Sequence, residues 1–356
     1  MTPLWVSVAA LQKYEKRKRM SGNYTEADDY ESYDDSIITL LTIAHKLYIY
    51  YVPAVICIGT ILNVFISVVL LKTRLRKRFH SHILAAISIC DAGFLVTLLF
   101  IWIKDQGIDV YKVPGLCQMV IFMMHFFPFL SFWYMIATCF LIMICPKCVC
   151  LTNTCNNVGK ARTLVISLSI FTFTIYVYKT WTNGIVNVDG VTFCTVLPET
   201  EKAMSILNIL DMVVLLLLPF LLFLFFHILT IINFVLKTVV TKSIGRSYMC
   251  RDYFKVIFAY TVCFHIFVGP GCISKILVLF RMTHEETPTY NFKDMIVENF
   301  IQYIFYTYFA VKPIVYMFIS RSFRYHFKEL ISKAKETINM TRTLVENSQS
   351  QEQTLL

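Results

Sequence analysis

Two oppositely charged residues stand inside long apolar stretches of this chain. Asp91 lies in the stretch 82–103, and Lys312 lies in the stretch 295–319. Each charge costs several kcal/mol if it is buried alone, and pairing offsets much of that cost. Their chemistry is therefore that of charge pairing or ion binding. Because the sequence has no visible catalytic triad, metal-protease motif or phosphate-binding loop, we predict no enzyme activity, no cofactor and no metal site.

Seven apolar blocks must position these charges. Apolar residues make up 57% of the chain and charged residues 16%, whereas soluble domains have about 25% charged residues. A helix of about 20 residues crosses the hydrocarbon core of a membrane and satisfies its own backbone there. We therefore predict an all-α membrane protein, a bundle of seven transmembrane helices. The blocks cover residues 43–71, 82–103, 116–145, 164–181, 204–236, 254–280 and 295–319.

Basic residues predict the orientation of the bundle. They follow the first, third, fifth and seventh blocks, as at Arg74, Lys160, Arg246 and Arg324, while the opposite links are nearly balanced. The positive-inside rule then places the N-terminus outside and the C-terminus in the cytoplasm of a plasma-membrane protein. The net charge of +10 is thus a topology signal, and we predict membrane lipid rather than nucleic acid as its partner.

The sequence divides into four segments. Residues 1–42 are an acidic, tyrosine-rich extracellular tail, which includes a glycosylation sequon at Asn23. Residues 43–319 form the bundle, 320–334 an amphipathic membrane-surface helix and 335–356 a polar cytoplasmic tail. The acidic tail suits electrostatic steering of a basic ligand, and the alternative is a solvated disordered segment.

The order of polar residues and prolines in the blocks resembles that of rhodopsin-like (class A) G-protein-coupled receptors. Gly59 and Asn63 have the spacing of the G-x-x-x-N element, and Asp91 ends a segment similar to L-A-x-A-D. Residues 312–316, Lys-Pro-Ile-Val-Tyr, resemble N-P-x-x-Y, and Phe323 follows as in the eighth helix. Each match is weak alone, but their joint order spans residues 59–333 and covers most of the chain.

This resemblance implies roles for several residues. It implies a disulfide between Cys117 and Cys194, and a mid-membrane ion layer. That layer would consist of Asn63, Asp91, Ser131 and Lys312. It also implies a packing switch formed by Phe132, Pro219, Phe264, Pro270, Pro313 and Tyr316.

The chain departs from the family at positions that matter for signalling. The inner end of the third helix reads Leu141-Ile142-Met143, without the acid and Arg of D/E-R-Y, and Val268 replaces the toggle Trp. Lys312 replaces the Asn of N-P-x-x-Y. We predict that Lys312 pairs with Asp91 and stands in for the family's sodium ion. The alternative is that Lys312 extends towards the cytoplasmic headgroups.

A mixed polar and aromatic pocket is predicted in the outer half. Amine receptors have an Asp where this chain has Met124, and opsins have a Lys where it has Tyr306, so a peptide is the favoured ligand. Ordinary packing between helices is the alternative reading of these positions. The pocket residues would be Trp102, Met124, His125, Asn208, Asp211, Lys275, Glu298, Gln302 and Tyr306.

These features favour a receptor for a neuropeptide or other peptide, with a G protein and arrestin as partners inside the cell. G-protein coupling would be weak, constitutive or lost. The alternatives are a non-signalling scavenger relative and a transporter or channel. The ending Thr354-Leu355-Leu356 resembles a PDZ ligand. Four cysteines of the second inner loop are free, acylated or zinc-bound: Cys145, Cys148, Cys150 and Cys155.

Overall fold

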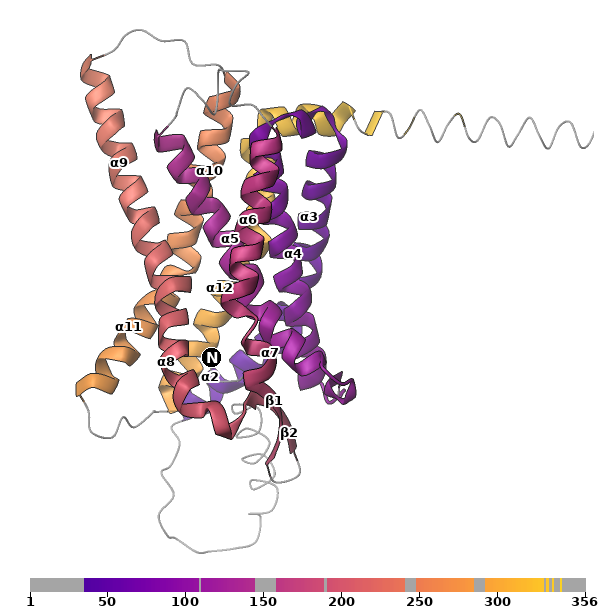
Figure 1. Cartoon of the computed structure of the whole chain (residues 1–356), viewed down its shortest axis with the longest axis vertical. Helices are drawn as coiled ribbons and strands as arrows, with labels where there is room; N and C mark the ends of the chain where they lie inside the picture. Colours follow the sequence, from indigo (N-terminus) through magenta and orange to yellow (C-terminus); the bar gives the residue numbers. More distant parts are fainter. Residues whose placement is uncertain are drawn as a thin grey trace, which may run out of the picture.

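A computed structural model describes residues 35–108, 110–144, 158–188, 191–240, 248–284 and 292–329, with residues 331, 332, 335 and 340. Within these ranges the chain is almost wholly helical, and its long helices run side by side (Figure 1). The first half contains α2 Asp35–Lys46, η2 Leu47–Tyr51, α3 Val52–Lys72, η3 Arg74–Lys77, α4 Phe79–Asp105, η4 Val110–Lys112, α5 Leu116–Ile144 and α6 Val158–Tyr176. The second half contains α7 Lys179–Thr182, β1 Asn183–Val188, β2 Val191–Val196, η5 Pro198–Thr200, α8 Glu201–Met212, η6 Val213–Leu217, α9 Leu218–Val240, α10 Tyr248–Phe267, α11 Gly269–His284 and α12 Phe292–Ile319.

Several of these helices are long and apolar enough to cross a membrane. Five qualify alone, namely Thr39–Lys72, Phe79–Asp105, Leu116–Ile142, Val158–Thr182 and Pro198–Ile232. Two bent pairs raise the number to seven if each pair is one span. The helical, multi-pass character of the predicted fold is therefore confirmed, whereas the exact number of seven stays a prediction.

Proline chemistry accounts for the bend in the first pair. The segments Tyr253–Phe267 and Gly269–Val278 meet at 41°. Pro270 lies just past the break, and a proline ring removes one backbone donor and clashes with the preceding turn. In the neighbouring helix, the π-helical turn η6 ends two residues before Pro219. Such turns are common where the regular helical hydrogen bonds are interrupted.

A second bend follows α12. The segments Asp294–Ile319 and Arg321–Glu329 meet at 85°, so the last helical piece runs across the end of the bundle (Figure 1). Phe323 anchors this piece, because its ring packs edge-on against Tyr316 at 4.9 Å between centroids. The predicted amphipathic segment 320–334 is thus helical over Arg321–Glu329.

The structure also contains a two-stranded sheet, which the sequence analysis did not predict. Strands β1 and β2 pair antiparallel, with Ile185 opposite Cys194. They lie at the end of the bundle opposite the Arg321–Glu329 helix (Figure 1).

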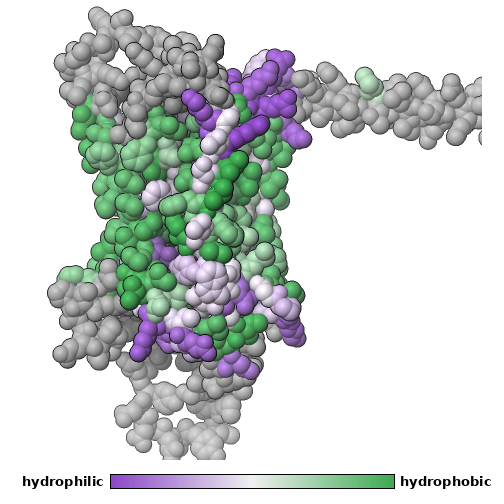
Figure 2. Space-filling model, in the orientation of Figure 1, coloured by the Kyte–Doolittle hydropathy of each residue, from purple (hydrophilic) through white to green (hydrophobic). Residues whose placement is uncertain are grey.

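The described surface has an apolar belt. Figure 2 shows hydrophobic residues covering the middle of the bundle and hydrophilic residues towards its ends. Large aliphatic side chains of the helices, such as Ile61, Ile166 and Ile206, are 57–67% exposed. Apolar surface on this scale indicates contact with lipid rather than water.

Candidate functional site

The centre of the bundle contains a buried ion pair. Nζ of Lys312, from α12, lies 2.7 Å from Oδ1 of Asp91, from α4. It also donates to Oγ of Ser131, from α5, at 2.8 Å, and Ser131 donates to Asp91 at 2.7 Å. Both charged side chains are only 1% exposed. The predicted pairing of Lys312 with Asp91 is confirmed, and the alternative in which Lys312 extends to the headgroups is wrong.

Aromatic rings complete the surroundings of the ammonium group. Nζ of Lys312 lies 4.4 Å from the ring centroid of Tyr308 and 5.1 Å from that of Phe309. Ring faces attract cations, most strongly where water is excluded. Oδ2 of Asp91 is buried and has no hydrogen-bond partner within the described part of the chain. The layer therefore satisfies the cation more completely than the carboxylate.

Asn63 is part of this layer by position but bonds to the backbone. Its Nδ2 donates to the carbonyls of Gly59 and Phe309, each at 2.9 Å, and so ties α3 to α12. A Cβ placed on Gly59 would lie 2.7 Å from Cβ of Ala310. The spacing of Gly59 and Asn63 thus has a local reason, because the glycine allows the close approach that the asparagine bridges.

The aromatic residues of the predicted switch pack together beside the ion pair. The ring of Phe264 lies 5.0 Å from that of Phe132 and 4.8 Å from that of Phe223. All three side chains are completely buried. Val268, also completely buried, stands one turn further along at the bend. Phe264, which belongs to α10, therefore packs between α5 and α9.

The other predicted switch residues are spread along the bundle. Pro219 and Pro270 lie at the helix interruptions, and Pro313 lies inside α12 next to Lys312. Tyr316 contacts Phe323 at the far end of the same helix. Sequence positions placed these residues on the correct elements, and the structure divides them into a mid-bundle and an end group.

A disulfide joins Cys117 to Cys194, which confirms the predicted bridge. It ties the start of α5 to β2 across 77 residues of sequence. Tyr111 and Val120 pack with Cys117 in a small apolar cluster. Burial raises the pKa of Tyr111 to about 12, so its hydroxyl stays neutral at this end of the bundle.

Two residues of the predicted pocket meet at a second buried cation. Nζ of Lys179 lies 2.7 Å from Oδ2 of Asp211 and donates to Oδ1 of Asn208 at 3.1 Å. The hydroxyl of Tyr178 donates to the same carboxylate at 3.2 Å. Lys179 is only 2% exposed. Nearby, the ring of His125 lies tilted against that of Tyr176, at 5.8 Å between centroids.

Sequence reasoning missed Lys179, although a signal was available. The residue lies near the end of the apolar block 164–181, where it looks like an ordinary interfacial lysine. An acidic residue inside the next block, Asp211, needs a partner. Lys179 is that partner.

The remaining pocket residues form separate contacts. Lys275 of α11 and Glu298 of α12 pair at 2.6 Å. The indole of Trp102 donates to the carbonyl of Tyr48 at 3.2 Å. Tyr306 is buried against Phe94 at 6.2 Å. Met124 and Gln302 are half-buried. The nine predicted residues therefore divide into several contact groups rather than one continuous set.

Neither a family model nor a curated protein matches this chain.

Several predicted features lie outside the described residues. They are the sequon at Asn23, the acidic part of the tail before residue 35, the cysteines Cys145, Cys148, Cys150 and Cys155, and most of the segment 335–356. These stay predictions.

Proposed function

We propose that this chain is a divergent rhodopsin-like receptor whose seven helices cross the plasma membrane and whose outer end binds a peptide. The observation that carries the proposal is the layer of Asp91, Ser131 and Lys312, which links three helices at mid-bundle. The disulfide at one end and the bend at Pro270 support it. The seven crossings are then the five separate spans, the bent pair Tyr253–Phe267 with Gly269–Val278, and the helix Asp294–Ile319, while Arg321–Glu329 is the membrane-surface helix.

A peptide with groups of both charge signs fits the outer end. Lys179 with Asp211, and Lys275 with Glu298, offer two ion pairs on different helices. Lys275 is 31% exposed, so solvent and ligand can reach that pair, whereas Lys179 is 2% exposed. Lys275 and Glu298 are therefore the contacts that a charged ligand exchanges most easily.

The geometry suggests how such a ligand would act. Competition for the Lys275–Glu298 contact loosens α11 from α12, and motion about Pro270 carries α10 with it. Phe264 would then leave its place between Phe132 and Phe223. A ligand shifts this equilibrium only as far as it binds one state better than the other.

A non-signalling ligand-binding protein is the second candidate, and one observation favours it. The inner end of α5 carries Leu141-Ile142-Met143 and no arginine, so the family's contact for a G-protein helix is absent. A scavenger or decoy would use the same outer end without the inner response.

Guanine-nucleotide exchange in membranes separates these candidates. We expect fractionated peptide extracts to stimulate exchange by co-expressed G proteins in cells that contain the full-length chain. Binding of a purified active peptide without exchange would instead support the scavenger. Ion or solute flux in liposomes, with neither binding nor exchange, would support a transporter or channel and reject both candidates.

A charge-swap series locates the ligand contact. Lys275→Glu and Glu298→Lys each break the pair, and the double swap restores it in reverse. We expect each single variant to bind the peptide at least about tenfold more weakly, since one interfacial charge contact contributes about 1.5 kcal/mol or more. Lys202→Glu, a change at an exposed residue near the same end, is the matched control. Equal losses in the control would contradict the assignment.

A further inference from the structure

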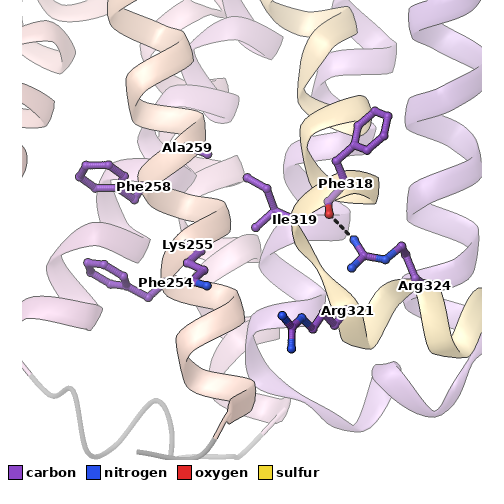
Figure 3. Close-up of a pocket in the computed structure, with 8 residues that line it drawn as sticks. All are labelled: Phe254, Lys255, Phe258, Ala259, Phe318, Ile319, Arg321 and Arg324. Carbon is purple, nitrogen blue, oxygen red and sulfur yellow. Dashed lines mark hydrogen bonds between the residues drawn. The ribbon is translucent and has the colours of Figure 1, made fainter.

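A cavity of about 500 Å³ opens beside α10 at the end of the bundle that carries the Arg321–Glu329 helix (Figure 3). It lies between α10 and the turn that follows α12. Three cationic side chains line it, namely Lys255, Arg321 and Arg324. Figure 3 shows Lys255 and Arg321 directed towards the space between the two helices. The cavity is distant in sequence and in space from the outer ion pairs.

Two of the three cations form no ion pair with the side chains that the structure describes. Arg324 donates to the carbonyls of Met317 and Phe318, which are free because α12 ends there. Lys255 and Arg321 are exposed, and neither forms an ion pair with any acidic residue in the ranges that the structure describes. Two uncompensated charges therefore face one cavity, and their mutual repulsion favours an anion between them.

The rest of the lining is apolar, and all of it except Phe254 lies deeper along the helices than the cations do. Phe258 is three residues beyond Lys255, which is about 4.5 Å of helix rise. Phe318 is 76% exposed, and it lies on the side of the cavity formed by α12. A ligand here meets cations at the end of the bundle and hydrocarbon-like surface towards its middle.

We propose that this cavity binds the phosphate-bearing headgroup of an acidic phospholipid, with an acyl chain against the exposed ring of Phe318. Guanidinium groups form paired hydrogen bonds with phosphate oxygens, and an ammonium adds a point charge. Basic cavities between helices at a membrane surface are suited to such headgroups. A free phosphate ester would meet the same cations but would leave the apolar wall uncovered. The lipid bridges α10 and α12, whether or not the chain is a receptor.

Native mass spectrometry of the full-length protein tests the site. The purified protein is mixed with dioctanoyl phosphatidylinositol phosphate, dioctanoyl phosphatidylserine or dioctanoyl phosphatidylcholine, and bound lipids are counted. Soluble inositol phosphate is a separate arm. We expect the acidic lipids to bind at least about tenfold more tightly than phosphatidylcholine. Inositol phosphate that binds as tightly as the lipids would overturn the lipid assignment, and so would equal binding of all three lipids.

Variants then place the binding at the cavity. The double variant Lys255→Gln/Arg321→Gln should weaken acidic-lipid binding about 25-fold, because each cation near an acidic membrane surface contributes about fivefold. The control Arg76→Gln/Lys328→Gln removes the same two charge types from exposed positions at the same end of the bundle. An equal loss in the control would overturn the proposal, because the attraction would then belong to the whole basic end.

A third variant tests the acyl contact. Phe318→Ala changes an exposed side chain, so the bundle does not depend on it. This variant should bind the acidic lipids more weakly than the natural protein does. Its binding of inositol phosphate, which is weaker from the start, should be unchanged. Unchanged lipid binding in Phe318→Ala would refute the placement of the acyl chain.

Discussion

Lys312 and Asp91 hold their opposite charges 2.7 Å apart at the centre of the bundle, with each side chain 1% exposed. The contact joins residues separated by 221 positions in the sequence, from α12 and α4. Because both groups are buried away from water, removing one of them lowers the stability of the fold more than removing both.

The ion pair therefore predicts an asymmetric mutant series. Lys312→Met leaves Asp91 as a lone buried charge, and we expect it to lower stability by about 3–5 kcal/mol. The double variant Lys312→Met/Asp91→Asn should recover most of that loss, because no uncompensated charge remains. Thermal unfolding of the detergent-purified proteins measures the effect. A double variant no more stable than Lys312→Met would show that the two charges do not compensate each other.

The proposed replacement of sodium predicts a gain of ion sensitivity. The natural chain should have the same melting temperature in sodium chloride and in choline chloride. Lys312→Asn vacates the ammonium position beside Asp91 and Ser131, so sodium should raise the melting temperature of this variant. Lys312→Asn/Asp91→Asn is the control, and it should not respond. A natural chain that sodium stabilises would contradict the replacement.

The contact between Gly59 and Ala310 predicts a steric effect. Gly59→Val places side-chain atoms where Cβ alone would be 2.7 Å from Cβ of Ala310. Overpacking of this kind costs about 1–3 kcal/mol. Gly271→Ala is the control, since its new Cβ would lie 3.6 Å from Ile301, an ordinary contact. Thermal unfolding should show a clear loss for the first variant and little change for the second.

The disulfide predicts a covalent link that chemistry can detect. Peptides containing Cys117 and Cys194 should be joined in non-reduced digests of the full-length protein. Cys194→Ser should lower stability by about 2–5 kcal/mol. The measurements are mass spectrometry and thermal unfolding. Free, reactive Cys117 in the natural protein would rule out the bridge.

The buried ion pair of Lys179 and Asp211 predicts coupling between neighbouring helices. Lys179→Met leaves Asp211 buried without its cation, so we expect a loss of about 3–5 kcal/mol. Lys179→Met/Asp211→Asn should recover much of it. Lys202→Met, on an exposed lysine of α8, provides the matched control and should change stability by less than about 0.5 kcal/mol. Equal effects of the two single variants would argue against a buried pair.

The sequence contained enough information for the elements and for the central charge pair. Apolar block length predicts helices because the membrane leaves few alternatives, and Asp91 with Lys312 predicts a pair because lone buried charges are costly. The direction in which each helix faces its neighbours is less accessible. Asn208 and Asp211 meet Lys179, and Glu298 meets Lys275, so residues assigned to one pocket occupy separate contacts. Helix rotation, which follows from packing of the whole bundle, decides that division.

Local sequence also gave little warning of the hairpin. The two strands in residues 183–196 are short, and their sequence mixes polar and apolar residues. Their pairing depends on the disulfide and on packing against α5 and α7. Likewise, Pro270 predicts a bend. The π-helical turn η6 before Pro219 depends instead on how this segment packs against other helices. These features depend on contacts between segments, which a pattern within one segment does not contain.

The ammonium beside Asp91 is attached to the polypeptide by its own side chain. Each molecule consequently has one counter-ion for Asp91 built into its own chain, and dialysis cannot remove it. A diffusible cation would come and go with the salinity of the surroundings. Here the amine is covalently part of the chain, so its position beside Asp91 does not depend on the salt concentration of the medium.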